Sequence, residues 1–226
     1  MVKLGVAVPC YKYHIQKLKR CLDSIEAQTK KPDFVVVSSS SCEASDIPAE
    51  YIDGHYSFPL RILTFRNRQN ASENRNIAAA LCKFEGCTHI SFFDCDDEMH
   101  PQRIEAIHLA LKVQPDTHFI AHSFYEKEEV VTQPFQIYEG FQVVLNELRR
   151  SVSGCALLDT DWDARIHHSQ CTVSTDIWNR IKYREAKELE RREDAIFCGE
   201  VLLSRDVKTV YIRNPLSKYY FEGAWY

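Results

Sequence analysis

The chain has 226 residues and 45% of them are hydrophobic, so it can bury one sizeable core or two small ones. Its formal net charge of −4 gives no basic field over the whole molecule, which argues against nucleic acid as a partner. Because no run of about 18 apolar residues occurs, we expect no transmembrane segment.

The cysteines and glycines narrow the class of protein further. The nine cysteines are odd in number, form no CxxC pair and follow no secretory leader, which favours reduced thiols, a cytoplasmic location and no zinc site. None of the seven glycines belongs to a GxGxxG or GxxxxGK motif, which excludes the usual phosphate-binding loops of dehydrogenases and P-loop enzymes. A phosphate group would have to be bound in another way.

The first half of the chain alternates strands and helices. Short apolar or β-branched runs predict the strands, and apolar residues at helical spacing predict the helices. Strands are expected at residues 4–8, 34–37, 60–65 and 89–93, and helices at 15–30, 72–81 and 101–115. Asn70 or Ser72 is suited to cap the second helix, and Pro101 suits the first turn of the third. This alternation predicts an α/β sheet with helices on its faces.

The regular alternation of strands and helices ends beyond Asp116, and we expect a boundary between two halves of the chain near residues 115–125. Strands are predicted at 119–124, 130–138 and 209–212, and helices at 138–150, around 177–178 and from Glu193 onward. Residues 155–170 are polar and aromatic and give no assignable pattern. The second half is therefore less regular than the first.

The most informative stretch is the acidic cluster Asp94, Cys95, Asp96 and Asp97, which follows the buried strand at 89–93. Carboxylates this close repel one another, so the arrangement calls for a divalent cation or a set of hydrogen-bond donors. The alternative is an ordinary solvated turn, because Asp is common where a strand ends. Strands of doubly wound sheets present their carboxyl ends to ligands, so we predict a metal-bound diphosphate here.

The loops after the first four strands are expected to meet at one edge of the sheet. These loops contain residues 9–11, 38–41, 70–76 and 94–97. A nucleotide lying across all four would place its base near the first two loops and its diphosphate near the last.

With these residues in this order, the chain resembles the GT-A fold glycosyltransferases of the inverting family 2 kind over nearly its whole length. The matching motifs are Val8-Pro9-Cys10-Tyr11, Leu22-Asp23-Ser24-Ile25 with Gln28 and Pro32, Asn74-Arg75-Asn76, Asp94 to Asp97, and Glu193-Asp194. The resemblance implies a Rossmann-like, mixed and mainly parallel sheet flanked by helices. It also implies one catalytic domain over 1–226, with a nucleotide-sugar-binding half at about 1–118 and a C-terminal acceptor-side subdomain at about 119–226.

The resemblance also implies roles for the donor-binding residues. Asp94 would contact the ribose, and Asp96 would bind the Mn²⁺ or Mg²⁺ that bridges the two phosphates. Asp97 would be a second metal ligand or would orient its neighbours. The full predicted donor site is Pro9, Tyr11, Ser38, Ser39, Asn70, Arg75, Asp94 and Asp96.

Two features of this donor site depend on the chemistry of particular side chains. Arg75 offers a planar guanidinium fork that matches phosphate or ribose oxygens, although it is also compatible with an ordinary surface arginine. The family usually has an Asp pair after the second strand, where this chain has Ser38 and Ser39. The choice of base is therefore open.

Glu193 and Asp194 supply the predicted catalytic pair. By the resemblance, Asp194 takes the proton from the acceptor hydroxyl and Glu193 positions the acceptor. A carboxylate suffices as the base because the proton moves late, when the hydroxyl oxygen has become positive. The alternative is that both residues only stabilise the N-terminus of a helix.

The resemblance implies a metal-dependent inverting glycosyltransferase that moves a sugar from a nucleoside diphosphate donor, with a UDP-sugar expected, to a hydroxyl of a glycan or glycoconjugate. A sugar-nucleotide nucleotidyltransferase is one alternative, but it would need a Gly-rich loop near the N-terminus that this chain lacks. A noncatalytic glycan- or nucleotide-binding module of the same fold is the other. The sequence is compatible with one catalytic unit of a larger polypeptide.

Overall fold

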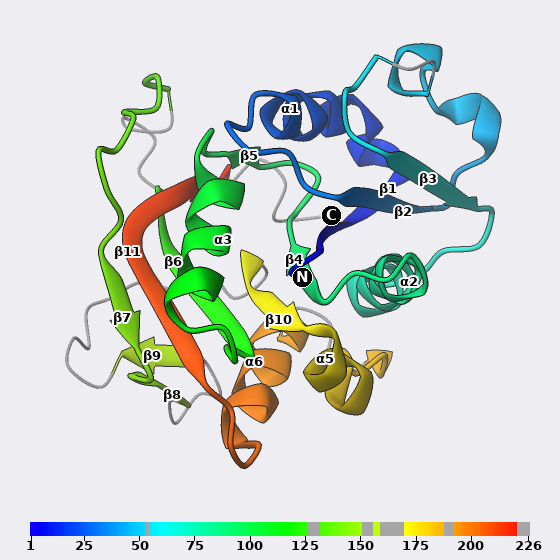
Figure 1. Cartoon of the computed structure of the whole chain (residues 1–226). Helices are drawn as coiled ribbons and strands as arrows, with labels where there is room; N and C mark the ends of the chain where they lie inside the picture. The colour runs from blue at the N-terminus through cyan, green and yellow to red at the C-terminus, as the bar shows by residue number, and fades with distance from the viewer. Residues whose placement is uncertain (53–54, 126–131, 151–155, 159–169, 188–191, 221–226) are drawn as a thin grey trace.

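The computed structural model describes residues 1–52, 55–125, 132–150, 156–158, 170–187 and 192–220 (Figure 1). The helices are α1 (Ile15–Glu26), α2 (Ala71–Phe84), α3 (Arg103–Val113), α5 (Thr175–Ile181) and α6 (Glu193–Leu203), with short 3-10 turns η1 (Lys12–His14), η2 (Ala44–Asp46) and η3 (Ala49–Tyr51). The strands are β1 (Leu4–Tyr11), β2 (Phe34–Ser40), β3 (Leu60–Phe65), β4 (His89–Phe92), β5 (Glu98–Met99), β6 (Phe119–Tyr125), β7 (Val143–Leu145), β8 (Leu148–Arg150), β9 (Ala156–Leu158), β10 (Thr172–Ser174) and β11 (Thr209–Lys218).

Within the described ranges, nine strands form one mixed sheet with the order β3-β2-β1-β4-β10-β6-β11-β5, and β7 also pairs with β11. The first four strands in this order are mutually parallel. Strand β10 is antiparallel to both β4 and β6, whereas β11 is parallel to β6. The predicted α/β class with a mixed sheet is confirmed, and strands from both halves of the chain share the sheet.

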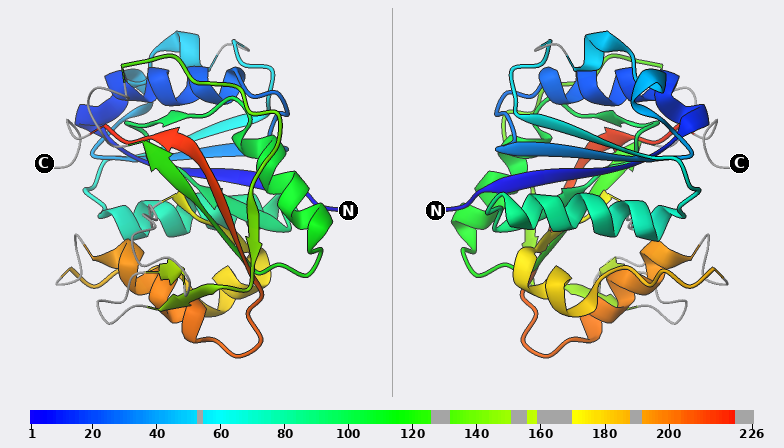
Figure 2. Two further views of the ribbon diagram at one scale, coloured as in Figure 1. Left: turned by 90° about the vertical axis from the view of Figure 1, so that its left-hand side faces the viewer. Right: turned by 90° about the vertical axis from the view of Figure 1, so that its right-hand side faces the viewer.

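Helices cover both faces of the sheet, because side chains along a strand point alternately to its two faces. Val6 and Val8 of β1 pack into a core with α1 and α3, whereas Ala7 between them packs into a second core with α2, α5 and α6. Figure 2 shows α1 on one side of the strands and α2 on the other. The molecule therefore has three layers around two hydrophobic cores.

Helix α2 packs closely against β1. A Cβ atom on Gly5 would lie 2.8 Å from the Sγ atom of Cys82, so a larger residue at position 5 would force the helix and strand apart. This close packing fixes the C-terminal part of α2 against the amino end of β1.

Gln28 connects α1 to the start of α3. Its Nε2 donates to the backbone oxygen of Ser24 (3.0 Å) and of His100 (2.7 Å). Its Oε1 accepts from the backbone N–H of Ile104 at 3.0 Å, which satisfies a donor in the first turn of α3. Gln28, one of the residues that carried the family resemblance, therefore has a structural role.

The helix predicted at 138–150 is wrong. The chain instead forms β7 and β8 there, separated by Asn146 with a positive φ of 57°, which a helix does not allow. Strand β7 pairs antiparallel with β11. The apolar spacing of this short segment also fits a helix, so pairing with a distant strand decided its conformation.

The strand predicted at 130–138 is also wrong over 132–138, where no strand forms; residues 130 and 131 lie outside the described ranges.

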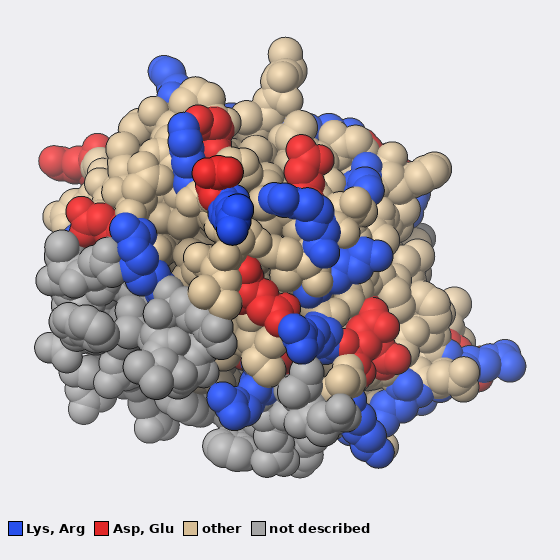
Figure 3. Space-filling model, turned by 90° about the horizontal axis from the view of Figure 1, so that it is seen from below, with Lys and Arg blue, Asp and Glu red and all other residues tan. Residues whose placement is uncertain are grey.

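Two other features of the structure concern the hydrophobicity of its helices and the charge of its surface. No helix in the described part of the chain is both long and apolar enough to cross a membrane. Figure 3 shows basic and acidic side chains interleaved on the face seen from below, in keeping with the small net charge.

Candidate functional site

Three consecutive residues of α2, Asn74, Arg75 and Asn76, are buried and join three parts of the candidate site. Asn74 bonds to the first two strands. Its Oδ1 accepts from the Ser38 hydroxyl at 2.8 Å, and its Nδ2 donates to the backbone oxygen of Cys10 at 3.3 Å and to the hydroxyl of Ser40 at 3.2 Å. The carboxyl ends of β1 and β2 are therefore fixed to the start of α2.

Arg75 bridges the two acidic motifs. One Nη atom donates to Oδ1 of Asp94 and the other to Oε1 of Glu193, both at 2.9 Å. The side chains of Arg75, Asp94 and Glu193 are 6%, 20% and 12% exposed, so the bridge is largely shielded from water. Burial opposes the charge of Arg75, but Asp94 and Glu193 raise its pKa above the ordinary value, so it stays a cation.

Asn76 binds the segment that precedes the predicted catalytic pair. Its Nδ2 donates to the backbone oxygen of Tyr183 and to Oε1 of Glu185, both at 2.8 Å, and its Oδ1 accepts from the N–H of Tyr183 at 3.0 Å. The ring of Tyr183 stacks on Phe197 of α6, with centroids 4.0 Å apart. The second half of the chain is thereby held against α2.

The three aspartates after β4 differ in their surroundings. Asp97 is fully buried; its Oδ1 accepts from the N–H of Tyr220 at 2.9 Å, and its Oδ2 accepts from Nε2 of Gln170. Asp94 and Asp96 are partly exposed. Burial, and next the charge of Asp94, raise the pKa of Asp96 to about 6.

These surroundings fit a divalent cation at Asp96. A carboxylate whose charge is disfavoured by burial and by a like charge gains from a nearby cation. No group of three or more metal-ligating side chains gathers among the described residues, but Mg²⁺ commonly takes one or two carboxylates and completes its shell with phosphates and water. Asp97 already accepts bonds at both oxygens, which favours an orienting role for it.

Glu193 and Asp194 lie in the first turn of α6, and no side chain caps this helix. Oδ1 of Asp194 accepts from the N–H of Ala195 at 2.6 Å. Burial raises the pKa of Asp194, and although Arg75 opposes this shift, the neighbouring charge of Glu193 adds to it. Asp194 is thus more basic than an ordinary aspartate, as a proton acceptor near neutral pH requires.

The other predicted donor residues lie along the same edge of the sheet. Pro9 is buried in β1 directly opposite Ser38 of β2. Ser38 and Ser39 are fully buried; the Ser38 hydroxyl is bonded to Asn74, whereas the Oγ atom of Ser39 has no partner among the described residues. Tyr11 is partly exposed and contacts Tyr13 edge to face, with centroids 5.3 Å apart.

Asn70, one of the two residues predicted as a cap, is the N-cap of α2. Its Oδ1 accepts from the N–H of Glu73 at 2.9 Å, and the Glu73 carboxylate accepts from the N–H of Asn70 at 2.7 Å, which forms a capping box. Its Nδ2 donates to the backbone oxygen of Glu185 at 3.0 Å. This local role accounts for Asn70 without a ligand, and its contact with a donor stays a prediction.

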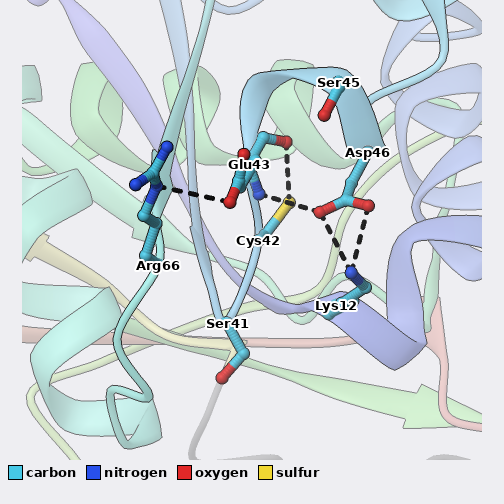
Figure 4. A pocket seen from close by; sticks show the side chains of 7 residues that line it. All are labelled: Lys12, Ser41, Cys42, Glu43, Ser45, Asp46 and Arg66. Atoms are coloured by element: carbon cyan, nitrogen blue, oxygen red, sulfur yellow. Dashed lines mark hydrogen bonds and ion pairs between the residues drawn. The ribbon is translucent and has the colours of Figure 1, made fainter.

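A polar pocket of about 330 Å³ lies beyond the ends of β1, β2 and β3 (Figure 4). Its charged side chains are paired: Lys12 with Asp46 at 3.1 Å and Arg66 with Glu43 at 3.3 Å. Ser41, at its edge, has a positive φ of 54°, which is uncommon for serine. The pocket is lined by Lys12, Ser41, Cys42, Glu43, Ser45, Asp46 and Arg66.

Sequence reasoning missed most of this pocket. Ser41 fell within a loop expected to meet the ligand, but the charged residues around it did not, because they come from three loops with no shared motif. Their clustering was not readable from spacing along the chain.

Residues 5–170 match the family described as Glycosyl transferase family 2. A curated protein of Haemophilus influenzae, described as an uncharacterized glycosyltransferase, is 28% identical over 132 residues, which make up 58% of this chain and 42% of that protein. The chain therefore spans less than half the length of this curated relative.

Solved structures share the fold. The TarS structure from S. aureus in complex with UDP has a TM-score of 0.71 at 15% identity, covering 96% of this chain and 60% of that chain. Its complex with UDP-GlcNAc has the same TM-score and identity over 58% of that chain. A mannosyltransferase of Pyrobaculum calidifontis, in complex with GDP-Man and Mn²⁺, has a TM-score of 0.61 at 13% identity, covering 96% of this chain and 56% of that chain.

Proposed function

The chain belongs to glycosyl transferase family 2, and on that premise we propose that it transfers a sugar from a nucleoside diphosphate sugar to an acceptor hydroxyl, with inversion at the anomeric carbon. The observation that carries the proposal is the Arg75 bridge. It brings Asp94, from the predicted donor site, and Glu193, from the predicted catalytic pair, to one guanidinium. Residues 99 positions apart in the sequence thus form one charged cluster, as a donor and an acceptor meeting at one carbon require.

The donor would lie along the edge formed by Pro9, Tyr11, Ser38 and Ser39, with its ribose at Asp94. A UDP-sugar is the proposed donor, supported by the folds similar to this one that were solved with UDP and UDP-GlcNAc. Another structure of similar fold was solved with GDP-Man, so a guanine base is the alternative to test. The fully buried Ser39 hydroxyl would contribute to the choice of base only after a local rearrangement.

Asp96 would hold the proposed Mn²⁺ or Mg²⁺, with Asp97 orienting the turn that carries it. When bound, the cation would neutralise charge on the departing diphosphate. The presence of Mn²⁺ in the mannosyltransferase structure supports a divalent metal.

Asp194 is the proposed base. The proton of the acceptor O–H passes to its carboxylate while the acceptor oxygen forms a bond to the anomeric carbon. The bond from that carbon to the diphosphate oxygen breaks on the opposite face, and the electron pair leaves with the diphosphate. Glu193, held by Arg75, would position the acceptor.

The wider assignments are proposals too. Residues of about 1–118 would bind the donor and those of about 119–226 a glycan or glycoconjugate acceptor. Because the chain spans only part of its relatives, it is compatible with one catalytic unit of a larger polypeptide. A cytoplasmic location stays a prediction. A noncatalytic binding module of this fold would bind the donor and transfer nothing, and the assays below separate the two.

Nucleotide sugars should stabilise the protein in a metal-dependent way. At about 100 times its Kd, a donor adds about 2.7 kcal/mol of stability, or roughly 5–10 °C in Tm for a chain of this size. We expect this shift with UDP-sugars plus Mn²⁺, measured by thermal unfolding over a panel of nucleotide sugars. In Asp96→Asn the metal-dependent part should disappear, while it should persist in Asp116→Asn, a control at an exposed site. An equal shift without metal would contradict the cation assignment.

The pH dependence of transfer should reveal the environment of Asp194. A base works when deprotonated, so kcat/KM falls as the pH drops through its pKa, and a raised pKa moves this fall to higher pH than for an ordinary aspartate. Glu193→Gln removes a neighbouring negative charge and should therefore move the acid limb to lower pH. The check is a pH profile of kcat/KM for the acceptor, measured for both proteins at saturating donor. If the acid limb stays in place or moves to higher pH in Glu193→Gln, a group other than Asp194 controls it.

A further inference from the structure

A buried arginine lies behind the acidic motif. Arg103, the first residue of α3, is fully buried, and no carboxylate in the described part of the chain forms an ion pair with it. Its guanidinium lies over the ring of Phe93, 4.7 Å from the centroid. A buried cation without a direct counter-ion costs several kcal/mol, so packing alone gives no reason for an arginine here.

The guanidinium bonds to the end of β4 and to Gln170. Nη2 donates to the Ser91 hydroxyl at 3.0 Å and to the backbone oxygens of Phe92 at 3.1 Å and Gln170 at 2.9 Å. Nε donates to Nε2 of His122 at 2.9 Å. Because Nδ1 of His122 lies 2.7 Å from a backbone oxygen, that nitrogen carries the proton and Nε2 accepts the bond from Arg103.

The network continues from Gln170 to the acidic motif. The Gln170 side chain donates to Oδ2 of Asp97, whose Oδ1 accepts from the N–H of Tyr220. Arg20 in turn lies 3.5 Å from the ring centroid of Tyr220 and donates to the backbone oxygen of Asp96. Arg103 thus reaches Asp97 through a single residue, and Asp97 connects the motif to the end of β11.

We propose that Arg103 is a positioning residue that, through Gln170 and Asp97, fixes the backbone turn carrying Asp94 and Asp96 in the geometry that binds the donor. The inference rests on the proposed function, because it assigns donor binding to that turn. Among the described residues, Arg103 forms no hydrogen bond with Glu193 or Asp194 of the proposed catalytic pair. It holds the end of β4 directly and holds the turn through one hydrogen-bonded intermediary.

Two substitutions test different links of the network. Arg103→Lys keeps a positive charge and one donor nitrogen but loses the second donor, the Nε–H that bonds to His122. Gln170→Met keeps the backbone oxygen that Arg103 binds and removes the donor to Asp97. We expect each to raise KM for the donor about 10–100-fold, the range for groups that orient ligating side chains. The kcat and the KM for the acceptor should change much less, because Asp194 lies outside the network.

The donor KM of the double variant Arg103→Lys with Gln170→Met should be no higher than the larger of the two single-variant values. The two substitutions should not add, because they break links of the same path. Ile107→Ala is the matched control, since it truncates another fully buried residue of α3 that is not in the network. It should lower Tm without raising the donor KM. If it raises KM as much as the network variants do, or if those variants leave KM unchanged, the positioning role is refuted.

A second measurement does not depend on activity. The Tyr220 amide is protected by its bond to Asp97, so native-state hydrogen exchange at Tyr220 should be faster in Gln170→Met than in Ile107→Ala at matched stability. Equal exchange rates would overturn the inference. If the unsubstituted protein binds no nucleotide sugar, the proposed function fails, and the exchange result still shows whether the network holds the turn.

Discussion

Asp194→Asn should reduce kcat by about 10²–10⁴-fold while leaving the donor affinity unchanged. The amide has nearly the shape of the carboxylate but cannot take the acceptor proton. Oδ1 of Asp194 already accepts from the N–H of Ala195, and the amide oxygen can keep that bond, so the start of α6 should stay folded. Single-turnover transfer measures the chemical step, and calorimetry with donor and metal measures binding.

The control for this variant is Asp176→Asn, which also lies in the first turn of a helix but is exposed. It should keep full activity. Unchanged turnover in Asp194→Asn would remove this residue from the mechanism, whereas full donor binding with no turnover in the unsubstituted protein would favour the noncatalytic module.

Arg75→Met should be the most destabilising substitution at the site. It leaves Asp94 and Glu193 without their shared partner in a largely buried cluster, and removing one member of such a cluster typically costs about 3–5 kcal/mol. For a chain of this size that is roughly 6–20 °C in Tm. Thermal unfolding followed by circular dichroism, without ligand, measures the loss.

The pH dependence of this loss identifies its cause. Unpaired buried carboxylates have raised pKa values and are relieved by protonation, so the stability gap between Arg75→Met and the unsubstituted protein should narrow as the pH falls. Adding Glu193→Gln should recover part of the loss. Arg184→Met is the control, because the pair of Arg184 with Glu200 is solvent-exposed on the arginine side and should contribute under about 1 kcal/mol. A loss that is small or independent of pH would show that the bridge is not what stabilises the site.

The first half of the fold was predictable because its signals are local. The buried run of β4 ends in carboxylates, and Asn70 caps the helix after β3. Both features depend on residues within a few positions of one another, where periodicity and capping chemistry decide the structure. The start of α6 at Glu193 was predicted for the same reason.

The segment at 138–150 shows where local signals fail. Its apolar spacing fits a helix, but β7 adds to the edge of β11 and Asn146 donates to the backbone oxygen of Thr209 at 2.8 Å. A three-residue strand has too few residues for its alternation to be distinguished from a turn of helix. Its partner strand lies more than 60 positions further along the chain.

The sequence by itself determined which side chains are present at the strand ends and the family to which they point. Tertiary structure alone decided their partners. Arg75 contacts Asp94 and Glu193, 19 and 118 positions away, and Asp97 is bonded by Gln170 and Tyr220, 73 and 123 positions away. Burial patterns along one element follow from its own periodicity, whereas such pairings depend on how separate elements pack, which spacing along the chain does not encode.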